Sequence, residues 1–256
     1  MTEIGYFILG TVAGVLSGLF GIGGGIVMVP SLIAFFGLDI LDANSTSLTA
    51  MLLPVSILGV VSYYKAGYLH LRDASIIAAG LFVGSFFGGE LAVNINEQLL
   101  AFLYIGILLY VAFGYLDVYS RFGKKKDPLS GVTNVQPSWW AFLLLGIGAG
   151  VFAGLFGKGG GLVIVPVLIS LFHYDTKTAA ATSLAALQLP VGLPSVVIYA
   201  QNGHLHLFNA AIIAVGIIIG AAFGSKIAIK LSSLLFKKLY AFFLLAVAVY
   251  MIYKYI

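Results

Sequence analysis

The stretch from Gly10 to Pro30, GTVAGVLSGLFGIGGGIVMVP, occurs a second time from Gly146 to Pro166 as GIGAGVFAGLFGKGGGLVIVP. The two blocks match at 14 of 21 positions, at an offset of 136 residues. The match continues without a gap, so that 41 of the 79 positions from 10 to 88 are identical to their counterparts. A match of this extent at one fixed offset indicates a duplicated structural unit. We therefore expect two copies of one fold.

The composition is that of a membrane protein. Of the 256 residues, 61% are hydrophobic, 9% are charged and 32 are glycine. Soluble domains carry about 25% charged residues, so a soluble globular protein is excluded. The absence of cysteine excludes disulfides, thiolate metal sites and cysteine nucleophiles. Glu3 stands where a cleavable signal peptide needs a basic region, so we expect no such peptide.

Each copy contains five apolar segments. They cover residues 4–20, 26–37, 44–64, 73–92 and 98–118 in the first copy, and 139–156, 162–172, 181–201, 209–229 and 235–253 in the second. The last three of each copy have about 20 residues, enough to cross a hydrocarbon core of about 30 Å. We predict an all-α polytopic membrane protein whose repeats each have a glycine-broken helix pair and three full spans. Residues 1–119 form repeat 1, residues 120–138 a cytoplasmic linker, and residues 139–256 repeat 2.

The basic residues predict how the two repeats are related. The linker carries Arg121 and Lys124 to Lys126, and the positive-inside rule places such a segment in the cytoplasm. If the glycine-broken pair returns to the side from which it enters, each repeat crosses the membrane an odd number of times. Repeat 2 is then inverted, with 11 of the 13 basic residues on the cytoplasmic side and Asp39 and Asp42 on the other. A parallel repeat would leave four lysines outside, so we predict inverted repeats.

Two triple glycines, Gly23-Gly24-Gly25 and Gly159-Gly160-Gly161, each interrupt a helix and precede a new one. Irregular backbone within a bilayer is tolerated only where it is buried in protein or lines a cavity. The first N–H groups of the new helix lack intrahelical acceptors and lie at the positive end of its dipole, which favours an anion. The alternative is close helix packing through small residues, which we expect of Gly14 and Gly18.

Lys158 breaks the symmetry of the repeats, because its counterpart is Ile22. A lysine near the bilayer centre costs about 2.5–3.5 kcal/mol on insertion scales. An anionic substrate would offset that cost, so we interpret Lys158 as the charge of a binding site. The alternative is a lysine that extends to the headgroup region.

Polar residues open the third segment of each repeat: Asn44, Ser45 and Thr46 in the first, Thr182 and Ser183 in the second. Such residues are good helix N-caps, and capping would explain them. With inverted repeats, these helix starts could instead face the glycine loops across a central cavity.

Three further features have both a structural and a functional interpretation. Gln188 replaces Leu52 within a span and is either an interhelical hydrogen bond or a substrate contact. Pro54, Pro190 and Pro194 kink or unwind their helices. The matched pair His70 and His206 lies next to span ends, which favours interfacial structural histidines over a proton relay. Tyr63 and Tyr199 are among the aromatic residues expected at the membrane interface.

The duplicated GxxxGLFGxGGGxxxVP blocks resemble the sulfite exporter TauE/SafE family, also called the toluene sulfonate uptake permease family. The resemblance covers nearly the whole chain. It implies a cytoplasmic-membrane permease for sulfur-containing anions such as sulfite or organosulfonates. Family members are described with seven or eight spans, often as tandem four-span repeats, and the glycine-broken pair and inverted arrangement differ from that description.

We therefore expect a secondary transporter, built from paired repeats with interrupted helices and an anion site near the midplane. The predicted substrate-binding residues are Gly23, Gly24, Gly25, Asn44, Ser45, Thr46, Lys158, Gly159, Gly160, Gly161, Thr182, Ser183 and Gln188. We expect no catalytic residue, metal, cofactor or nucleic-acid partner; the partners are a small anion and the lipid bilayer. Without an ATP-binding motif, gradients would drive transport, and proton coupling and oligomeric state are left open. The alternatives are a passive anion channel or a permease for a non-sulfur organic anion. An intramembrane enzyme would need a buried carboxylate or cysteine that the spans lack.

Overall fold

The computed structural model describes residues 2–122, 137–157 and 160–255, and over these ranges the regular structure is α-helical throughout. The first repeat contains α1 (Thr2–Phe20), α2 (Gly25–Phe36), α3 (Ile40–Ala50), α4 (Ile57–Lys65), α5 (Leu71–Asn94) and α6 (Glu97–Phe122). The second contains α7 (Trp139–Phe156), α8 (Gly161–Ser170), α9 (Thr176–Ala186), α10 (Leu193–Gln201), α11 (Leu207–Lys230) and α12 (Ser233–Tyr255). The all-α prediction is confirmed.

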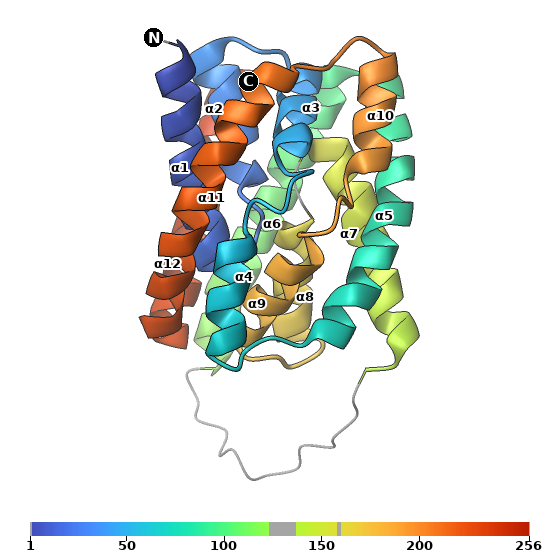
Figure 1. Ribbon diagram of the computed structural model, residues 1–256. Coiled ribbons are helices and arrows are strands. Elements are labelled where there is room, and N and C mark those ends of the chain that lie inside the picture. The colour runs from blue at the N-terminus through green and yellow to red at the C-terminus, as the bar shows by residue number, and fades with distance from the viewer. Residues whose placement is uncertain (1, 123–136, 158–159, 256) are drawn as a thin grey trace.

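The long helices of each repeat pack against those of the other. Helix α1 lies along α11, and α5 lies along α7 (Figure 1). Both interfaces are lined by glycines: a Cβ added at Gly14 would lie 2.5 Å from the Ile217 carbonyl oxygen, and one at Gly84 would lie 2.1 Å from that of Ile147. Small residues at this spacing let two helix backbones touch, as in other membrane helix pairs. The packing role predicted for Gly14 and Gly18 is confirmed.

The third segment of each repeat is not one unbroken helix, and this corrects the prediction of a simple full span. Helix α3 ends at Ala50 and α4 begins at Ile57, with Pro54 between them. The second repeat has the same interruption between α9 and α10, around Pro190. Proline lacks the backbone N–H and its ring clashes with the preceding turn, so the helix stops there. Each repeat therefore has two interrupted elements, one at its glycines and one at its proline.

Within the described residues, four helices are long and apolar enough to cross a membrane, by length and composition: α1 from Glu3, α5, α7 and α11. Leu71–Asn94 and Leu207–Lys230 have 24 residues each, about 36 Å of helix at 1.5 Å per residue. The chain is thus a multi-pass membrane protein. Trp139 and Trp140 are exposed at the start of α7.

Many charged residues lie at the two ends of the molecule. At one end Lys65 closes α4, Arg72 opens α5, and the Lys177 ammonium donates to the Ile229 carbonyl oxygen at 2.7 Å. We call this the basic end. The opposite end, where α3 begins and α10 finishes (Figure 1), holds Asp39 and Asp42 and is called the acidic end.

Candidate substrate-binding site

Two glycine loops end α1 and α7 and begin α2 and α8. Gly21, Gly23 and Gly24 have φ values of +70°, +80° and +78°, and Gly157 and Gly160 have +63° and +69°. Glycine adopts this left-handed backbone conformation at little cost in conformational energy. The glycines of the sequence therefore account for both helix breaks. The predicted breaks at the triple glycines are confirmed. Lys158 and Gly159 lie outside the described residues.

Both loops present helix N-termini with the same hydrogen-bonding pattern. The Gly24 carbonyl accepts from the N–H groups of Val27 and Met28 at 3.0 and 3.2 Å, and the Gly160 carbonyl accepts from Val163 and Ile164 at 3.0 and 3.1 Å. The N–H groups before them, of Gly25 and Ile26 in α2 and of Gly161 and Leu162 in α8, are those that helix geometry leaves without an intrahelical acceptor. These four donors lie at the positive ends of two helix dipoles.

The two loops meet each other at the interface between the repeats. A Cβ added at Gly161 would lie 2.5 Å from the Ile22 Cα and 2.6 Å from the Gly21 carbonyl oxygen. From this contact α2 and α8 run toward opposite ends of the molecule (Figure 1). Close packing therefore explains why Gly161, Gly21 and Gly157 are glycines, in addition to any role of their N–H groups in binding an anion.

The predicted hydroxyl and amide residues lie inside helices rather than at their starts. The N-cap of α3 is Asp39, whose carboxylate accepts from the Asp42 N–H at 2.8 Å. The N-cap of α9 is Asp175, which accepts from the N–H of Lys177 at 2.9 Å. The capping interpretation of Asn44 to Thr46 and of Thr182 and Ser183 is therefore wrong, and their polarity needs another explanation.

These side chains pack directly on the glycine loops of the other repeat. Ser183 donates its hydroxyl to the Gly21 carbonyl at 2.7 Å, and the Asn44 amide donates to the Leu155 carbonyl at 3.0 Å. Asn44, Ser45, Thr46, Thr182 and Ser183 are all 0% exposed. The prediction that these residues face the loops across a cavity is thus wrong: they contact the loops directly.

Several buried polar atoms in this region have no hydrogen-bond partner within the described ranges. They are Asn44 Oδ1, Ser45 Oγ, Thr46 Oγ1, Ser47 Oγ, Thr49 Oγ1 and Thr182 Oγ1. An unsatisfied buried polar group costs about 1–3 kcal/mol, so a set of six points to a polar ligand or to water. Five of the six lie on α3, and the counterparts of Asn44, Ser45 and Thr49 are alanines. We call these six residues the α3 polar cluster; it makes the site asymmetric.

Gln188 occupies the break between α9 and α10 and connects it to the break in repeat 1. Its side-chain carbonyl accepts from the Ser56 N–H at 3.1 Å, and its amide donates to the Leu184 carbonyl at 2.8 Å. Ser56 is the N-cap residue of α4. With both polar atoms engaged, this geometry supports the interpretation as an interhelical hydrogen bond.

Comparison with known protein families identifies the family of this chain. Residues 6–251 match the family model described as sulfite exporter TauE/SafE. The chain belongs to the TauE/SafE family. This TauE/SafE chain is similar to a probable membrane transporter protein of Methanocaldococcus jannaschii, with 29% identity covering 88% of this chain and 86% of the relative.

Other relatives carry the same description. A probable membrane transporter protein of Bacillus subtilis is 27% identical over 83% of this chain and 85% of its own length. One of Xylella fastidiosa is 28% identical over 96% and 93%. No solved structure gives a significant match. The family and the names of these relatives support a membrane transporter.

Two tyrosines that were expected at the membrane interface have their rings buried inside the protein. Tyr63 and Tyr199 are 0% exposed, so neither side chain is presented to lipid. The Tyr63 hydroxyl donates to the Gly18 carbonyl at 3.0 Å, and the Tyr199 hydroxyl donates to the Gly154 carbonyl at 2.9 Å. Each tyrosine therefore holds the last turn of α1 or α7, next to a glycine loop. Their identity at equivalent positions of the two repeats was the available signal.

The matched histidines lie at opposite ends of the TauE/SafE protein. His70 lies 3.3 Å from the Asp73 carboxylate at the basic end, with 51% of its side chain exposed. His206 lies 3.2 Å from the Asp42 carboxylate at the acidic end. This placement supports structural roles in the connections rather than one relay that contains both.

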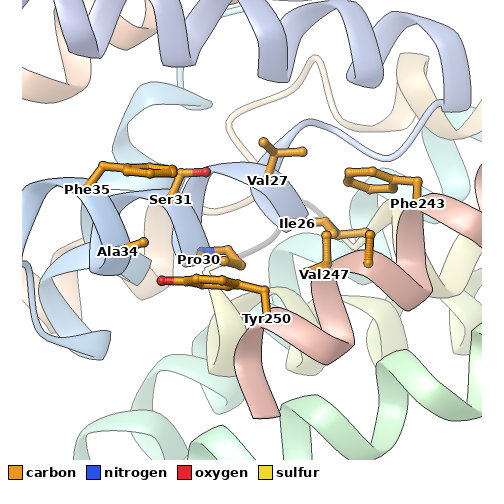
Figure 2. A pocket seen from close by; sticks show the side chains of 10 residues that line it. Ile26, Val27, Pro30, Ser31, Ala34, Phe35, Phe243, Val247 and Tyr250 are labelled. Atoms are coloured by element: carbon orange, nitrogen blue, oxygen red, sulfur yellow. The ribbon is translucent and has the colours of Figure 1, made fainter. Parts of the chain in front are cut away.

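Two hollows differ from the polar site in their chemistry. A groove of about 240 Å³ lies between α2 and α12, lined mainly by apolar side chains such as Val27, Phe35 and Phe243 (Figure 2). A gap of about 10 Å³ lies among Leu48, Met51, Leu187 and Val191, next to the two proline breaks. Their apolar linings make neither one a match for a small anion.

Proposed function

We propose that this protein is a secondary transporter that moves a small sulfur-containing anion, such as sulfite or an organosulfonate, across the cytoplasmic membrane by alternating access. The observation that carries the proposal is the α3 polar cluster, whose six buried atoms have no hydrogen-bond partner among the described residues and lie beside two helix N-termini. Hydroxyl O–H and backbone N–H groups are donors, and the oxygens of sulfite and sulfonate are acceptors. A site made of such donors offsets the anion's loss of water.

The proposed site combines donors from both repeats. Backbone N–H groups of Gly23 to Gly25 and of Gly159 to Gly161 supply the helix-terminus donors. Thr46 and Thr182 occupy equivalent positions, and their hydroxyls complete the site together with that of Ser45. Asn44 and Ser183 support the site by holding the glycine loops, through their hydrogen bonds to the Leu155 and Gly21 carbonyls. Lys158 supplies the positive charge in this proposal. Gln188 is assigned to the helix break rather than to the anion.

We further propose that the two repeats are inverted. The support is twofold: α1 packs on α11 as α7 packs on α5, and basic residues of both repeats gather at one end. The positive-inside rule makes that basic end cytoplasmic. Alternating access would then be a rocking of one repeat against the other around the contact of the two glycine loops.

The substrate class is tested by binding and then by flux. Purified protein is titrated with sulfite, sulfate, thiosulfate, an alkylsulfonate and acetate, and thermal stability and heat of binding are measured. Sulfur oxyanions should bind more tightly than acetate. Equal or stronger binding of carboxylates would instead favour a non-sulfur organic anion. In proteoliposomes, saturable and concentrative uptake supports a transporter, whereas linear flux that only equilibrates the anion supports a channel.

Substitutions of the α3 polar cluster test the site itself. Ser45→Ala inserts the residue that repeat 2 has at the equivalent position, Ala181, so the fold should tolerate it. A hydrogen bond to a charged group contributes about 1.5–3 kcal/mol, so Ser45→Ala and Thr46→Val should each weaken anion binding by about tenfold or more. Ser75→Ala is the matched control, because the exposed Ser75 hydroxyl bonds only within its own helix, to the Leu71 carbonyl. Unchanged anion affinity in both cluster variants would remove the cluster from the site.

A further inference from the structure

A second group of polar side chains lies at the acidic end, away from the α3 polar cluster. Asp39 and Asp42 belong to the start of α3, and His204 lies in the connection from α10 to α11. One ligand atom from each of these three side chains lies within 4.8 Å of the others. His204 Nδ1 is 2.8 Å from Asp42 Oδ1. The group thus joins repeat 1 to repeat 2 through carboxylate and imidazole atoms.

His206 approaches the same carboxylate from its other side. Its Nε2 lies 3.2 Å from Asp42 Oδ2, and this nitrogen is buried without a hydrogen bond of good geometry. Asp42 therefore has an imidazole at each oxygen. Such a partner fixes the orientation of a ligating carboxylate, as outer ligands do at metal sites.

The equivalent place at the basic end has different chemistry. There the connection from α8 to α9 meets the start of α5: the Tyr174 hydroxyl donates to Asp73 Oδ2 at 2.6 Å, and His70 lies 3.3 Å from the same oxygen. The counterparts of Asp42 and His204 in the other repeat are Thr178 and Tyr68. The other repeat thus keeps the counterparts of Asp39 and His206, which are Asp175 and His70, but it has neither the second carboxylate nor the second imidazole at the positions of Asp42 and His204.

We propose that Asp39, Asp42 and His204 form a binding site for a divalent first-row transition metal ion, with Zn²⁺ as the best match, and that His206 positions Asp42. Zinc takes imidazole nitrogen and carboxylate oxygen at about 2.0–2.2 Å in tetrahedral geometry, which places ligand atoms about 3.3–3.6 Å apart. The side chains need only small shifts to reach that spacing. Three protein ligands leave a fourth position for water. The imidazole favours transition metals over Mg²⁺ and Ca²⁺.

A bound ion would join the N-terminal turn of α3 to the connection between α10 and α11. Because α3 also carries the polar cluster, the ion would hold that helix against repeat 2. An effect on transport rests on the proposed function, whereas binding of the ion does not. The two are therefore measured separately.

The test is calorimetric titration of the full-length protein in detergent with Zn²⁺, and with Mg²⁺ and Ca²⁺ for comparison. We expect one Zn²⁺ per chain and much weaker binding of the other two. Asp42→Thr and His204→Tyr insert the residues that the other repeat has, and each should lower Zn²⁺ affinity by well over tenfold. A His206→Gln variant should lower it by about 10–100-fold, the usual effect of an outer ligand. His70→Gln is the matched control at the basic end and should bind as the parent does.

Thermal melting without metal verifies that each variant is folded, and His204→Gln replaces any variant that is not. Absence of Zn²⁺ binding by the parent, or equal affinity in the His204 and Asp42 variants, would overturn the proposal and leave a metal-free hydrogen-bonded contact. Equal binding of Mg²⁺ and Zn²⁺ would overturn the choice of a transition metal. In proteoliposomes, Zn²⁺ should slow anion flux by the parent but not by His204→Tyr. A protein that binds Zn²⁺ yet moves no anion would refute the transport proposal alone.

Discussion

Gly161 has no Cβ, and this allows the glycine loops of the two repeats to touch. A methyl group there would lie 2.5 Å from the Ile22 Cα, which is backbone and cannot rotate away. We therefore expect Gly161→Ala to separate the glycine loops and to lower the melting temperature and the yield of monodisperse protein. Size-exclusion chromatography and thermal melting in detergent measure both effects.

Gly148→Ala is the control for that substitution. Gly148 lies within α7, and a Cβ there has open space within 4 Å. Alanine in a helix interior is more favourable than glycine by about 0.5–1 kcal/mol, so this variant should melt at the same temperature as the parent or slightly higher. If Gly161→Ala melted like Gly148→Ala, the contact between the loops would not matter for stability.

At the scale of the element, the two proline breaks depend on each other through Gln188. Gln188→Leu inserts the residue found at the equivalent position 52, and it removes the acceptor of the Ser56 N–H at the start of α4. An unsatisfied buried donor costs about 1–3 kcal/mol, so the melting temperature should fall. Anion affinity should change less than about twofold, because both polar atoms of the Gln188 side chain are hydrogen-bonded within the protein. A large loss of affinity with unchanged stability would return Gln188 to the binding site.

The elements also show which features the sequence could predict. The glycine breaks were predictable because glycine acts on its own backbone, through the positive φ of Gly23 and Gly24. At Pro54 the sequence predicted a kink or an unwound turn but did not distinguish the two, because the apolar run from 44 to 64 continues through it. Contacts such as Ser183 to Gly21, or His204 to Asp42, join residues 162 positions apart. Such contacts follow from packing between repeats, which one sequence does not reveal.

At the scale of the whole molecule, the repeats interlock, because each supplies the helix that its partner's first helix packs against. The same contacts recur in both halves: α4 packs on α11 as α10 packs on α5, and α2 packs on α3 as α8 packs on α9. The asymmetric residues, in the α3 polar cluster and at the acidic end, then distinguish the two sides of an otherwise repeated frame.

The proposed inversion of the repeats can be tested by cysteine labelling, because the protein has no cysteine of its own. Ala66 and Asn202 are equivalent positions of the two repeats, both exposed, in the turns after α4 and α10. If the repeats are inverted with the basic end in the cytoplasm, a membrane-impermeant maleimide should label Asn202→Cys in intact cells and Ala66→Cys only after permeabilisation. Labelling after permeabilisation controls for reactivity at both sites. Parallel repeats would place both cysteines on one side of the membrane, and identical labelling of the two variants in intact cells would therefore contradict inversion, whichever side reacts.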